Sequence, residues 1–335
     1  MRLLAPLYAR GASWRRAWYA RHPEARRRLA RPVISVGNLV VGGSGKTPVV
    51  AALARWLLSE GQRPSILSRG YARKHSGDGV VVVSDPGRVL APVEQSGDEP
   101  QMLARALPGV PVLAGPDRFV AGCIAERRFD CTVHLLDDGF QHFPLHRDVD
   151  LVLVSSDDLR DSVLPAGRLR EPLEAARAAD ALLVTGRDGD PAEIAARLRV
   201  AHAFEVIASF GAPRSLKPYG AAVDPIEPAT RVLAVAGIAR PERFYSAARA
   251  QGWDVVAELS YRDHHWFSEG DLARIGDRAL AAGAQRILTT EKDAVRLLAL
   301  ADDVLDSFAY LPMTVAIEPA DEFRSFIKSR LVCSA

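Results

Sequence analysis

The chain has 335 residues, of which 48% are hydrophobic and 25% charged, and its formal net charge is +2 at pH 7. This composition is typical of a globular protein, and the length favours two domains. So mild a charge does not indicate nucleic acid as a partner, and we expect none. The three cysteines form no CxxC pair, so they suggest neither a zinc site nor a disulfide framework. No apolar run approaches the roughly 18 residues of a membrane-spanning helix, so we expect a soluble body.

Residues 1–30 differ from the rest because they carry eight arginines and a single acidic residue. If they form a helix, Leu3, Leu7, Trp14 and Trp18 lie roughly along one side, with arginines at the flanks. Tryptophan at headgroup depth and arginine facing anionic phosphates are typical of a helix in a membrane interface. We therefore predict a basic amphipathic helix on an anionic membrane surface. A basic helix packed on the body and an organellar transit peptide are the alternatives.

From residue 32 onward, short apolar runs alternate with helical segments. The runs consist almost entirely of valine, leucine and isoleucine, which is typical of a parallel sheet covered by helices on both faces. We expect strands over 32–39, 64–70, 79–85, 110–115, 131–138, 149–156 and 181–186. We expect helices over 47–61, after the SGDEP stretch at 96–100, and over 117–129.

The regular alternation weakens around residues 201–230, where four prolines fall in a short span, and it restarts at residue 231. The simplest account is a core over 31–210 and a smaller α/β domain over 215–335. The predicted fold class is therefore α/β, with a mainly parallel sheet of the P-loop NTPase type, helices on both faces, a second small domain and an N-terminal basic helix.

Residues 36–48 read VGNLVVGGSGKTP and resemble a phosphate-binding loop. The usual pattern is GxxxxGK[ST], and Val40 stands where its first glycine belongs. Glycines let backbone N–H groups face an anion, and the helix that follows adds its positive dipole end. A glycine-rich turn with an incidental lysine is the alternative. We predict that ATP binds to Gly42, Gly43, Ser44, Gly45, Lys46 and Thr47.

A phosphate loop needs an acid at the end of a nearby strand to hold Mg²⁺. The run VHLLDD ends in Asp137 and Asp138, and the hydroxyl of Thr47 would be a further metal ligand. Which of the two acids binds the metal directly stays open. Two acids that begin a turn before Gly139 are the alternative interpretation.

Asp98 and the histidine pair His264 and His265 are candidates for a base. Asp98 precedes a helix and is most simply its N-cap, with Pro100 in the first turn. The histidines follow Asp263, and such a pair is more often structural than catalytic. Together they allow a carboxylate of the first domain to orient an imidazole of the second, as in a general base for a hydroxyl nucleophile.

The stretch LPAGRLREP places Arg168, Arg170 and Glu171 in a loop. Because arginine binds phosphate in a bidentate way, a role on the nucleotide or on an anionic substrate is reasonable. A surface ion pair with Glu171 is the alternative. In TTEKD, at 289–293, helix capping explains the charged residues nearly as well as function does.

These motifs occur together and in one order, and they resemble the tetraacyldisaccharide 4'-kinase family, LpxK, over nearly the whole chain. The phosphate loop of that family also lacks the first glycine. The motifs are VGNLVVGGSGKTP, LSRGY, GDEP, DDGFQH, LPAGRLRE, AGIARPERF, DHHWF and TTEKDAV.

The resemblance implies a P-loop kinase bound peripherally at the cytoplasmic face of the bacterial inner membrane. It implies transfer of the ATP γ-phosphate, with Mg²⁺, to the 4'-hydroxyl of a tetraacylated glucosamine disaccharide 1-phosphate, the lipid A precursor, to give lipid IVA. By the same resemblance Asp98 and His264 form the base dyad, and Arg170 and Glu171 lie in the catalytic site. A lipid acceptor would also explain an N-terminal helix that reaches the headgroup layer.

A membrane-associated switch ATPase of the partitioning type is the alternative function, because its GGxGKT loop is similar. Such proteins carry a signature lysine just before the paired glycines, where this chain has Val41. They also need no second domain with a DHH motif.

Overall fold

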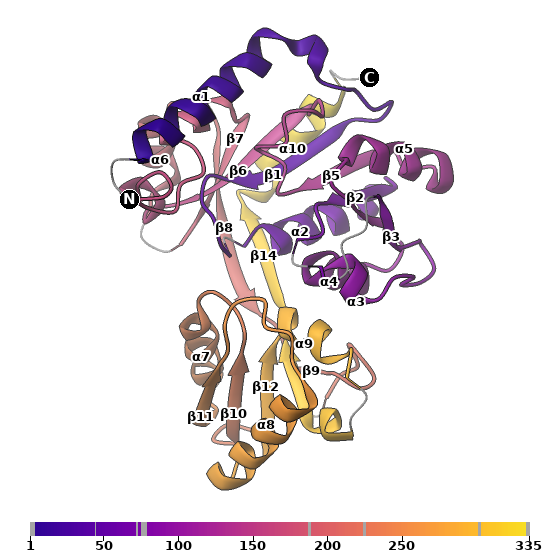
Figure 1. The fold of residues 1–335 in the computed structure, drawn as a ribbon, viewed down its shortest axis with the longest axis vertical. Coiled ribbons are helices and arrows are strands. Elements are labelled where there is room, and N and C mark those ends of the chain that lie inside the picture. The colour runs from indigo at the N-terminus through magenta and orange to yellow at the C-terminus, as the bar shows by residue number, and fades with distance from the viewer. Residues whose placement is uncertain are drawn as a thin grey trace.

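Two sheets form the frame of the molecule, one above the other in Figure 1. Within the described residues the larger sheet has nine strands and the smaller sheet has five. The architecture is the predicted α/β fold of the P-loop NTPase type with a second, smaller α/β body. The computed structural model describes residues 4–43, 45–71, 73–74, 79–186, 189–223, 226–300 and 303–332.

The larger sheet consists of β1 (Val33–Asn38), β2 (Pro64–Ser68), β3 (Val81–Ser84), β4 (Val112–Ala114), β5 (Val133–Asp137), β6 (Val149–Ser155), β7 (Ala181–Thr185), β8 (Ala203–Phe210) and β14 (Met313–Glu318). Their order is β14-β8-β7-β6-β1-β5-β2-β4-β3, and only the edge strands β3 and β14 run antiparallel to their neighbours. All residues of β1, at the centre, are buried. Burial along a whole strand requires cover on both faces, which explains the continuous apolar runs of the sequence.

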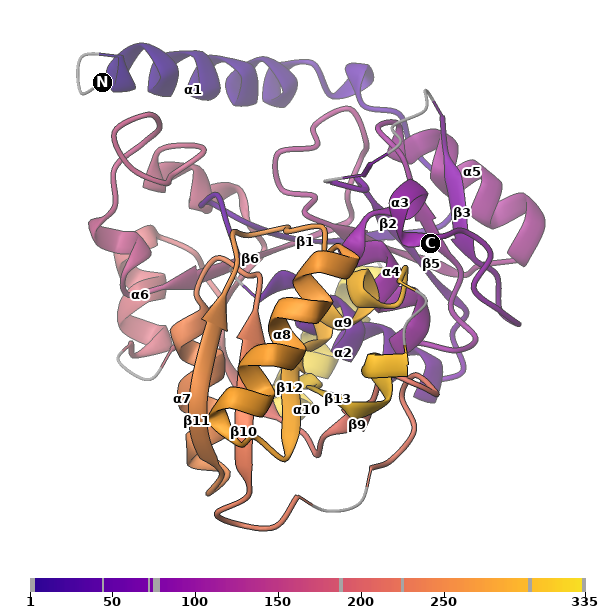
Figure 2. The same ribbon diagram turned by 60° about the horizontal axis from the view of Figure 1, so that its bottom comes forward.

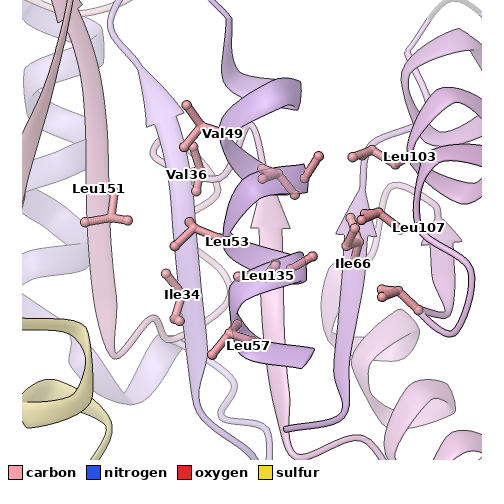
Figure 3. Packing of buried hydrophobic residues seen from close by; sticks show 14 of the residues in the cluster. Ile34, Val36, Val49, Leu53, Leu57, Ile66, Leu103, Leu107, Leu135 and Leu151 are labelled. Carbon is pink, nitrogen blue, oxygen red and sulfur yellow. The ribbon is translucent and has the colours of Figure 1, made fainter. Parts of the chain in front are cut away.

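Helices cover both faces of this sheet (Figure 1). They are α2 (Lys46–Ser59), α3 (Val93–Ser96), α4 (Asp98–Ala106), α5 (Arg118–Phe129), α6 (Pro191–Leu198) and α10 (Ala320–Val332). The 3-10 turns of this body are η1 (Pro23–Ala25), η2 (Asp158–Arg160) and η3 (Leu173–Ala178). Val49, Leu53 and Leu57 of α2 pack against Ile34 and Leu135 (Figure 3). Their spacing of four residues puts these side chains on one face of the helix. This packing fixes the start of α2 above the centre of the sheet.

The smaller sheet consists of β9 (Arg214–Ser215), β10 (Arg231–Ala236), β11 (Asp254–Ser260), β12 (Arg286–Thr290) and β13 (Phe308–Leu311). Their order is β11-β10-β12-β13-β9, with β9 alone antiparallel. Val232 and Ala234 of β10 face α7, and Leu233 and Val235 face α8. The helices of this body are α7 (Pro241–Ala250), α8 (Glu269–Ala282) and α9 (Glu291–Leu297), with the 3-10 turn η4 (Asp303–Ser307).

Two short connections join the bodies, from β8 to β9 and from β13 back to β14 (Figure 1). They lie side by side, because the N–H of Gly211 donates to the carbonyl oxygen of Pro312 at 2.9 Å. The chain then re-enters the larger sheet at Met313, and α10 packs into its core. The predicted second domain of 215–335 therefore extends too far, since residues 313–332 belong to the larger body. A strand has the same apolar pattern whichever sheet it joins, so this return could not be predicted from the pattern.

The N-terminal helix α1 (Ala5–Arg21) lies along the top of the larger body in Figure 2, and no residue of it is fully buried. Leu4, which precedes the helix, and Leu7, Tyr8 and Trp14 each expose between 42% and 65% of their surface. No helix in the described ranges is long and apolar enough to cross a membrane.

Of the side chains expected on one side of this helix, Leu7 and Trp14 are exposed, whereas Trp18 packs edge-on against Tyr19. Leu3 lies outside the described residues. Apolar and basic side chains are mixed around α1 rather than divided between two faces. The helix is therefore basic, as predicted, but it is not clearly amphipathic.

Candidate active site

The phosphate loop joins β1 to α2, and Val40 has a structural role in it. Val40 is buried and forms an isolated antiparallel bridge with Leu169. Beside this bridge the N–H of Arg170 donates to the carbonyl oxygen of Leu39 at 2.6 Å. The position of the missing glycine is therefore part of a two-strand pairing, where a β-branched side chain fits better than glycine.

The glycines after this pairing form an open turn at the N-terminus of α2. Gly42 and Gly45 have φ of 98° and 83°, a region in which other residues are strained. A Cβ at these positions or at Gly43 would meet no atom within 4 Å, so the turn has room for a ligand. The backbone N–H groups of such a turn and the dipole of α2 favour an anion there. Ser44, the remaining residue of the predicted loop, lies outside the described residues.

Lys46 and Arg170 converge on the carboxylate of Asp138. Lys46 Nζ lies 3.3 Å from Asp138 Oδ1 and donates to Asn38 Oδ1 at 3.1 Å. Arg170 Nη1 donates to both oxygens of Asp138, at 2.9 and 2.8 Å. Burial raises the pKa of Asp138, but the charges of Lys46 and Arg170 outweigh burial and hold this pKa below its usual value. Asp138 is therefore an ionised acid beside the phosphate loop.

Asp137 ends β5 and is buried next to the loop strand β1. Its Oδ1 has no hydrogen-bond partner among the described residues, and its Oδ2 accepts a 3.4 Å hydrogen bond from Ser68. Burial, followed by the carboxylates of Glu99 and Asp138, raises the pKa of Asp137 to about 7. A cation beside the two acids would relieve this crowding of negative charge.

The two acids fit the magnesium site predicted from the sequence. Mg²⁺ is usually held by one or two carboxylates, with the remaining positions taken by water and substrate phosphates. Asp137 and Asp138 supply such carboxylates, and Thr47 lies in the first turn of α2. The described residues contain no group of three or more His, Cys, Asp or Glu arranged to hold a metal.

Arg118, at the start of α5, adds a further buried cation near these acids. Its Nη1 donates to the carbonyl oxygen of Pro116 at 2.9 Å. Burial, and then the charge of Arg69, lowers the pKa of Arg118 to about 10, while Asp138 and Asp137 act in the opposite direction. The guanidinium remains charged at neutral pH and contributes to the positive field around the acids.

Asp98 and His264 meet where the two bodies face each other. His264 Nδ1 lies 2.8 Å from Asp98 Oδ2, and Asp98 is only 2% exposed. The predicted alternative, in which Asp98 is the N-cap of the helix, is wrong, because Gly97 occupies that position. Gly97 has φ of 87°, and a Cβ there would lie 2.6 Å from the carbonyl oxygen of Tyr71. Glycine therefore allows the close turn from which the carboxylate of Asp98 reaches His264.

Lys292 and Arg296 of α9 complete the surroundings of this pair. Lys292 Nζ lies 3.2 Å from His264 Nε2, and Arg296 Nε lies 3.4 Å from Asp98 Oδ2. Because an ammonium can only donate, Nε2 is the acceptor nitrogen of His264, and Nδ1 carries the proton that points to Asp98. Burial raises the pKa of Asp98, but the hydrogen bond from His264 and the charges of Lys292 and Arg296 outweigh it and lower the pKa.

The two adjacent histidines have different partners. His265 Nε2 lies 3.1 Å from Asp271 Oδ2, and its ring stacks on Tyr261 with the centroids 4.6 Å apart. His265 therefore supports the start of α8, and His264 is the histidine that contacts Asp98.

Glu171 pairs with the N-terminal helix rather than with the arginines of its own loop. Arg16 Nε donates to Glu171 Oε1 at 2.9 Å, and Arg16 Nη2 donates to Oε2 at 2.5 Å. Arg168 pairs instead with Asp161 at 2.7 Å. The surface ion pair that we considered for Glu171 is therefore wrong, because its side chain is only 3% exposed and its partner lies on α1.

Three side chains of this region were not predicted as part of the site. Gln141 Nε2 donates to the carbonyl oxygen of Asn38 at 2.9 Å and to Glu171 Oε2 at 3.3 Å. Lys292 could have been noticed, since it lies in the TTEKD stretch, for which function and helix capping both stayed open. Arg16 carried no signal, because it is one of eight arginines in a basic segment.

The glycine loop on the central strand, the lysine that follows it and the acids at the end of the adjacent strand define a P-loop NTPase. The model of the tetraacyldisaccharide-1-P 4'-kinase family matches residues 1–332. The chain therefore belongs to the tetraacyldisaccharide-1-P 4'-kinase family.

Individual relatives agree with this assignment. The tetraacyldisaccharide 4'-kinase of Pelobacter propionicus is 45% identical over 279 residues, which cover 82% of this chain and 76% of the relative. That of Geobacter sulfurreducens is 39% identical over 324 residues, which cover 94% and 89%. The crystal structure of "apo" form LpxK from Aquifex aeolicus in complex with ATP is 31% identical, covers 98% of this chain and 97% of that chain, and superposes with a TM-score of 0.79.

Proposed function

We propose that this chain transfers the γ-phosphate of ATP to the 4'-hydroxyl of a tetraacylated glucosamine disaccharide 1-phosphate, giving lipid IVA in lipid A biosynthesis. It is a kinase that uses ATP and Mg²⁺, in line with its family. The observation that carries the proposal is the 2.8 Å contact between Asp98 and His264 beside a phosphate loop. A partitioning-type switch ATPase has no acceptor hydroxyl and needs no such base, so that alternative is not favoured.

In this proposal the phosphate loop binds the nucleotide. The backbone N–H groups of Gly42, Gly43 and Gly45 face the phosphates, and Lys46 reaches the β- and γ-phosphates. Thr47, Asp137 and Asp138 would hold Mg²⁺, which neutralises charge on the transferred phosphoryl group when it is bound. Phosphoryl transfer depends mainly on such positioning and charge neutralisation.

The Asp98–His264 pair acts on the acceptor. The acceptor oxygen forms a bond to the γ-phosphorus, the bond from this phosphorus to the bridging oxygen of ADP breaks, and the hydroxyl proton passes to the pair. Glu99, the neighbour of Asp98, is close enough to raise the pKa of Asp137, so the pair and the metal-side acids lie in one site. Arg170 holds the second acid, Asp138, and Glu171 connects to Arg170 through Gln141.

The lipid acceptor gives the N-terminal helix a function. The acceptor hydroxyl lies at the headgroup layer, and α1 exposes apolar and basic side chains that suit an anionic membrane surface. We place the protein peripherally at the cytoplasmic face of the inner membrane, with α1 against the headgroups.

The Lys46→Ala variant tests the proposal. It removes the side chain that pairs with Asp138 and reaches the nucleotide, so phosphorylation of the lipid disaccharide should fall below detection while the protein remains folded. Product is measured with Mg-ATP and the acceptor dispersed in detergent, and folding is measured by circular dichroism. Lys328→Ala, which removes a surface lysine paired with Glu60, is the matched control and should keep wild-type turnover. If the wild-type protein forms no phosphorylated lipid, the proposed function is wrong.

A further inference from the structure

Arg16 connects α1 with the active-site region through the contacts of its side chain. Its guanidinium donates two hydrogen bonds to Glu171, at 2.9 and 2.5 Å, and also lies over the ring of Phe140, 4.1 Å from the centroid. Bidentate arginine–carboxylate pairs and cation–π contacts are both geometrically specific. The two side chains are only 17% and 3% exposed, so salt screens the pair weakly.

From Glu171, polar contacts continue to the nucleotide loop. Gln141 Nε2 donates to Glu171 Oε2 at 3.3 Å, and Gln141 Oε1 accepts from Arg170 Nη1 at 3.4 Å. Arg170 in turn donates to Asp138, whose Oδ1 lies 3.3 Å from Lys46 Nζ. One chain of contacts therefore connects α1 with the lysine of the phosphate loop.

The charges along this series of contacts make the position of the Arg170 side chain depend on Arg16. Within the part of the chain that the structure describes, the buried carboxylate of Glu171 would keep only the neutral amide of Gln141 as its hydrogen-bond donor if Arg16 were lost. A buried carboxylate without a cation is costly. The neighbouring Arg170 is the cation that can reorient toward it, and Arg170 is also the partner of Asp138. Loss of Arg16 should therefore draw Arg170 away from Asp138.

The rest of α1 is held loosely. Near Arg16, the guanidinium of Arg15 and the ring of Tyr19 lie 5.0 and 5.4 Å from the ring centroid of Phe143. Toward its N-terminus α1 borders a cavity of about 530 Å³, lined on the helix by Pro6 and Ala9 and on the body by side chains of 161–174. A change in the tilt of α1 is thus transmitted to the body mainly around Arg16.

We propose that Arg16 is a positioning residue for phosphoryl transfer, which holds Glu171 so that Arg170 stays on Asp138. Arg16 thereby couples the position of α1 against the body to the loop that binds ATP. In the proposed function α1 faces the lipid surface. The inference rests on the proposed function for its acceptor, whereas its effect on the nucleotide site does not depend on that acceptor.

The test compares Arg16→Gln with Arg16→Lys, Glu171→Gln and the double variant Arg16→Gln/Glu171→Gln. With acceptor dispersed in detergent, Arg16→Gln should lower kcat about tenfold, because a small displacement of catalytic groups has effects of this size or larger, and should leave KM for the acceptor nearly unchanged. Arg16→Lys keeps the charge and should recover part of the loss. In the Glu171→Gln background, Arg16→Gln should lower kcat by less than about twofold further, because both changes break the same pair.

Mg²⁺-dependent binding of a fluorescent ATP analogue is the second readout, and it needs no acceptor. Arg16→Gln should weaken this binding, whereas Arg63→Gln, which breaks the exposed pair with Asp130, should not. Arg10→Gln removes the same charge from an exposed position of α1, so it should weaken association with anionic vesicles as much as Arg16→Gln but lower kcat less.

Three results would each overturn the inference. The first is wild-type kcat and ATP binding in Arg16→Gln, and the second is a change confined to KM for the acceptor. The third is independent effects of the Arg16→Gln and Glu171→Gln substitutions on kcat. If Arg16→Gln does not fold, Arg16→Lys answers the question, because full turnover and wild-type ATP binding in a variant that cannot form the bidentate pair would also overturn it. Absence of lipid product in the wild type contradicts the proposed function, and the ATP-binding readout then still decides on Arg16.

Discussion

Asp98 is a buried carboxylate with several cationic or hydrogen-bonding neighbours. His264, Lys292 and Arg296 all lie within 3.8 Å of its Oδ2. Breaking a buried charge network leaves uncompensated charge and typically costs about 3 to 5 kcal/mol. These neighbours keep the carboxylate ionised, since they hold the pKa of Asp98 below its usual value in spite of burial. A pre-formed anion next to an imidazole is what removal of a hydroxyl proton requires.

Asp98→Asn and His264→Ala should lower kcat by about 10²- to 10⁴-fold, the usual contribution of a general base, with little change in ATP affinity. Steady-state kinetics and binding of an ATP analogue measure the two quantities separately. His265→Ala removes an imidazole that pairs with Asp271, so it should keep most of the turnover and serves as the control. Equal losses of turnover and ATP binding would place the Asp98–His264 pair on the nucleotide instead.

Single residues could be predicted from the sequence where a motif gave them a role. Lys46 and Asp138 belong to such motifs, and in the structure Lys46 Nζ lies 3.3 Å from Asp138 Oδ1. Lys292 lies in a motif that gave it no definite role, and Arg16 lies in none; the partners of both are far away in the chain, and a lysine or arginine on a helix is usually solvated. Their contacts depend on how the bodies and α1 pack, which no local pattern encodes.

Among the elements, the strands of the larger sheet were the most predictable. Burial on both faces demands unbroken apolar runs, and β1 and β5 are buried along their whole length. The existence of the N-terminal helix could be predicted, but the distribution of apolar and basic side chains around it could not. Because it touches the body only in part, no core imposes a 3.6-residue apolar period on it.

Deleting residues 1–28 should reduce association with anionic vesicles by at least about tenfold. Each arginine near an anionic surface contributes about 1 kcal/mol, and the deletion removes several of them together with Leu7 and Trp14. The cut precedes Leu29, which is buried in the body, so the core remains complete. Vesicle sedimentation measures the effect, and zwitterionic vesicles are the reference. Unchanged sedimentation would mean that α1 is only a basic helix packed on the body.

At the scale of the whole molecule, the two bodies meet through polar side chains beside two short connections. Lys292 Nζ lies 3.7 Å from Glu99 Oε1 of the larger body and 3.5 Å from Asp263 Oδ1 of its own body. Partly exposed ion pairs contribute only about 0 to 1 kcal/mol each. Such contacts favour one relative placement of the bodies without locking it.

Lys292→Ala should therefore shift the population toward wider separation of the bodies. Small-angle X-ray scattering should show a larger radius of gyration than in the wild type, and turnover should fall because Asp98 and His264 meet less often. Arg249→Ala breaks an exposed ion pair inside the smaller body and should leave the radius of gyration as it is. An unchanged radius in Lys292→Ala would show that Lys292 does not set the placement of the bodies.

The path of the chain between the bodies was the part of the fold least accessible from sequence. Alternating strands and helices predicted two α/β bodies. They did not predict that the chain returns to the larger sheet after Pro312. Periodicity is a local property, whereas the choice of sheet depends on which edge remains unpaired. At Phe210 and Met313, β8 pairs with β14 along an edge that would otherwise be open.

The bridge between Val40 and Leu169 also has a consequence for biosynthesis. On the ribosome the glycine loop is made early, whereas its pairing partner emerges only when about half of the chain has been translated. Pairing of distant segments cannot precede the synthesis of the second one. The loop therefore reaches its final form only once the strands on both sides of β1 exist, so a nascent chain does not have a complete ATP site before its central sheet has formed.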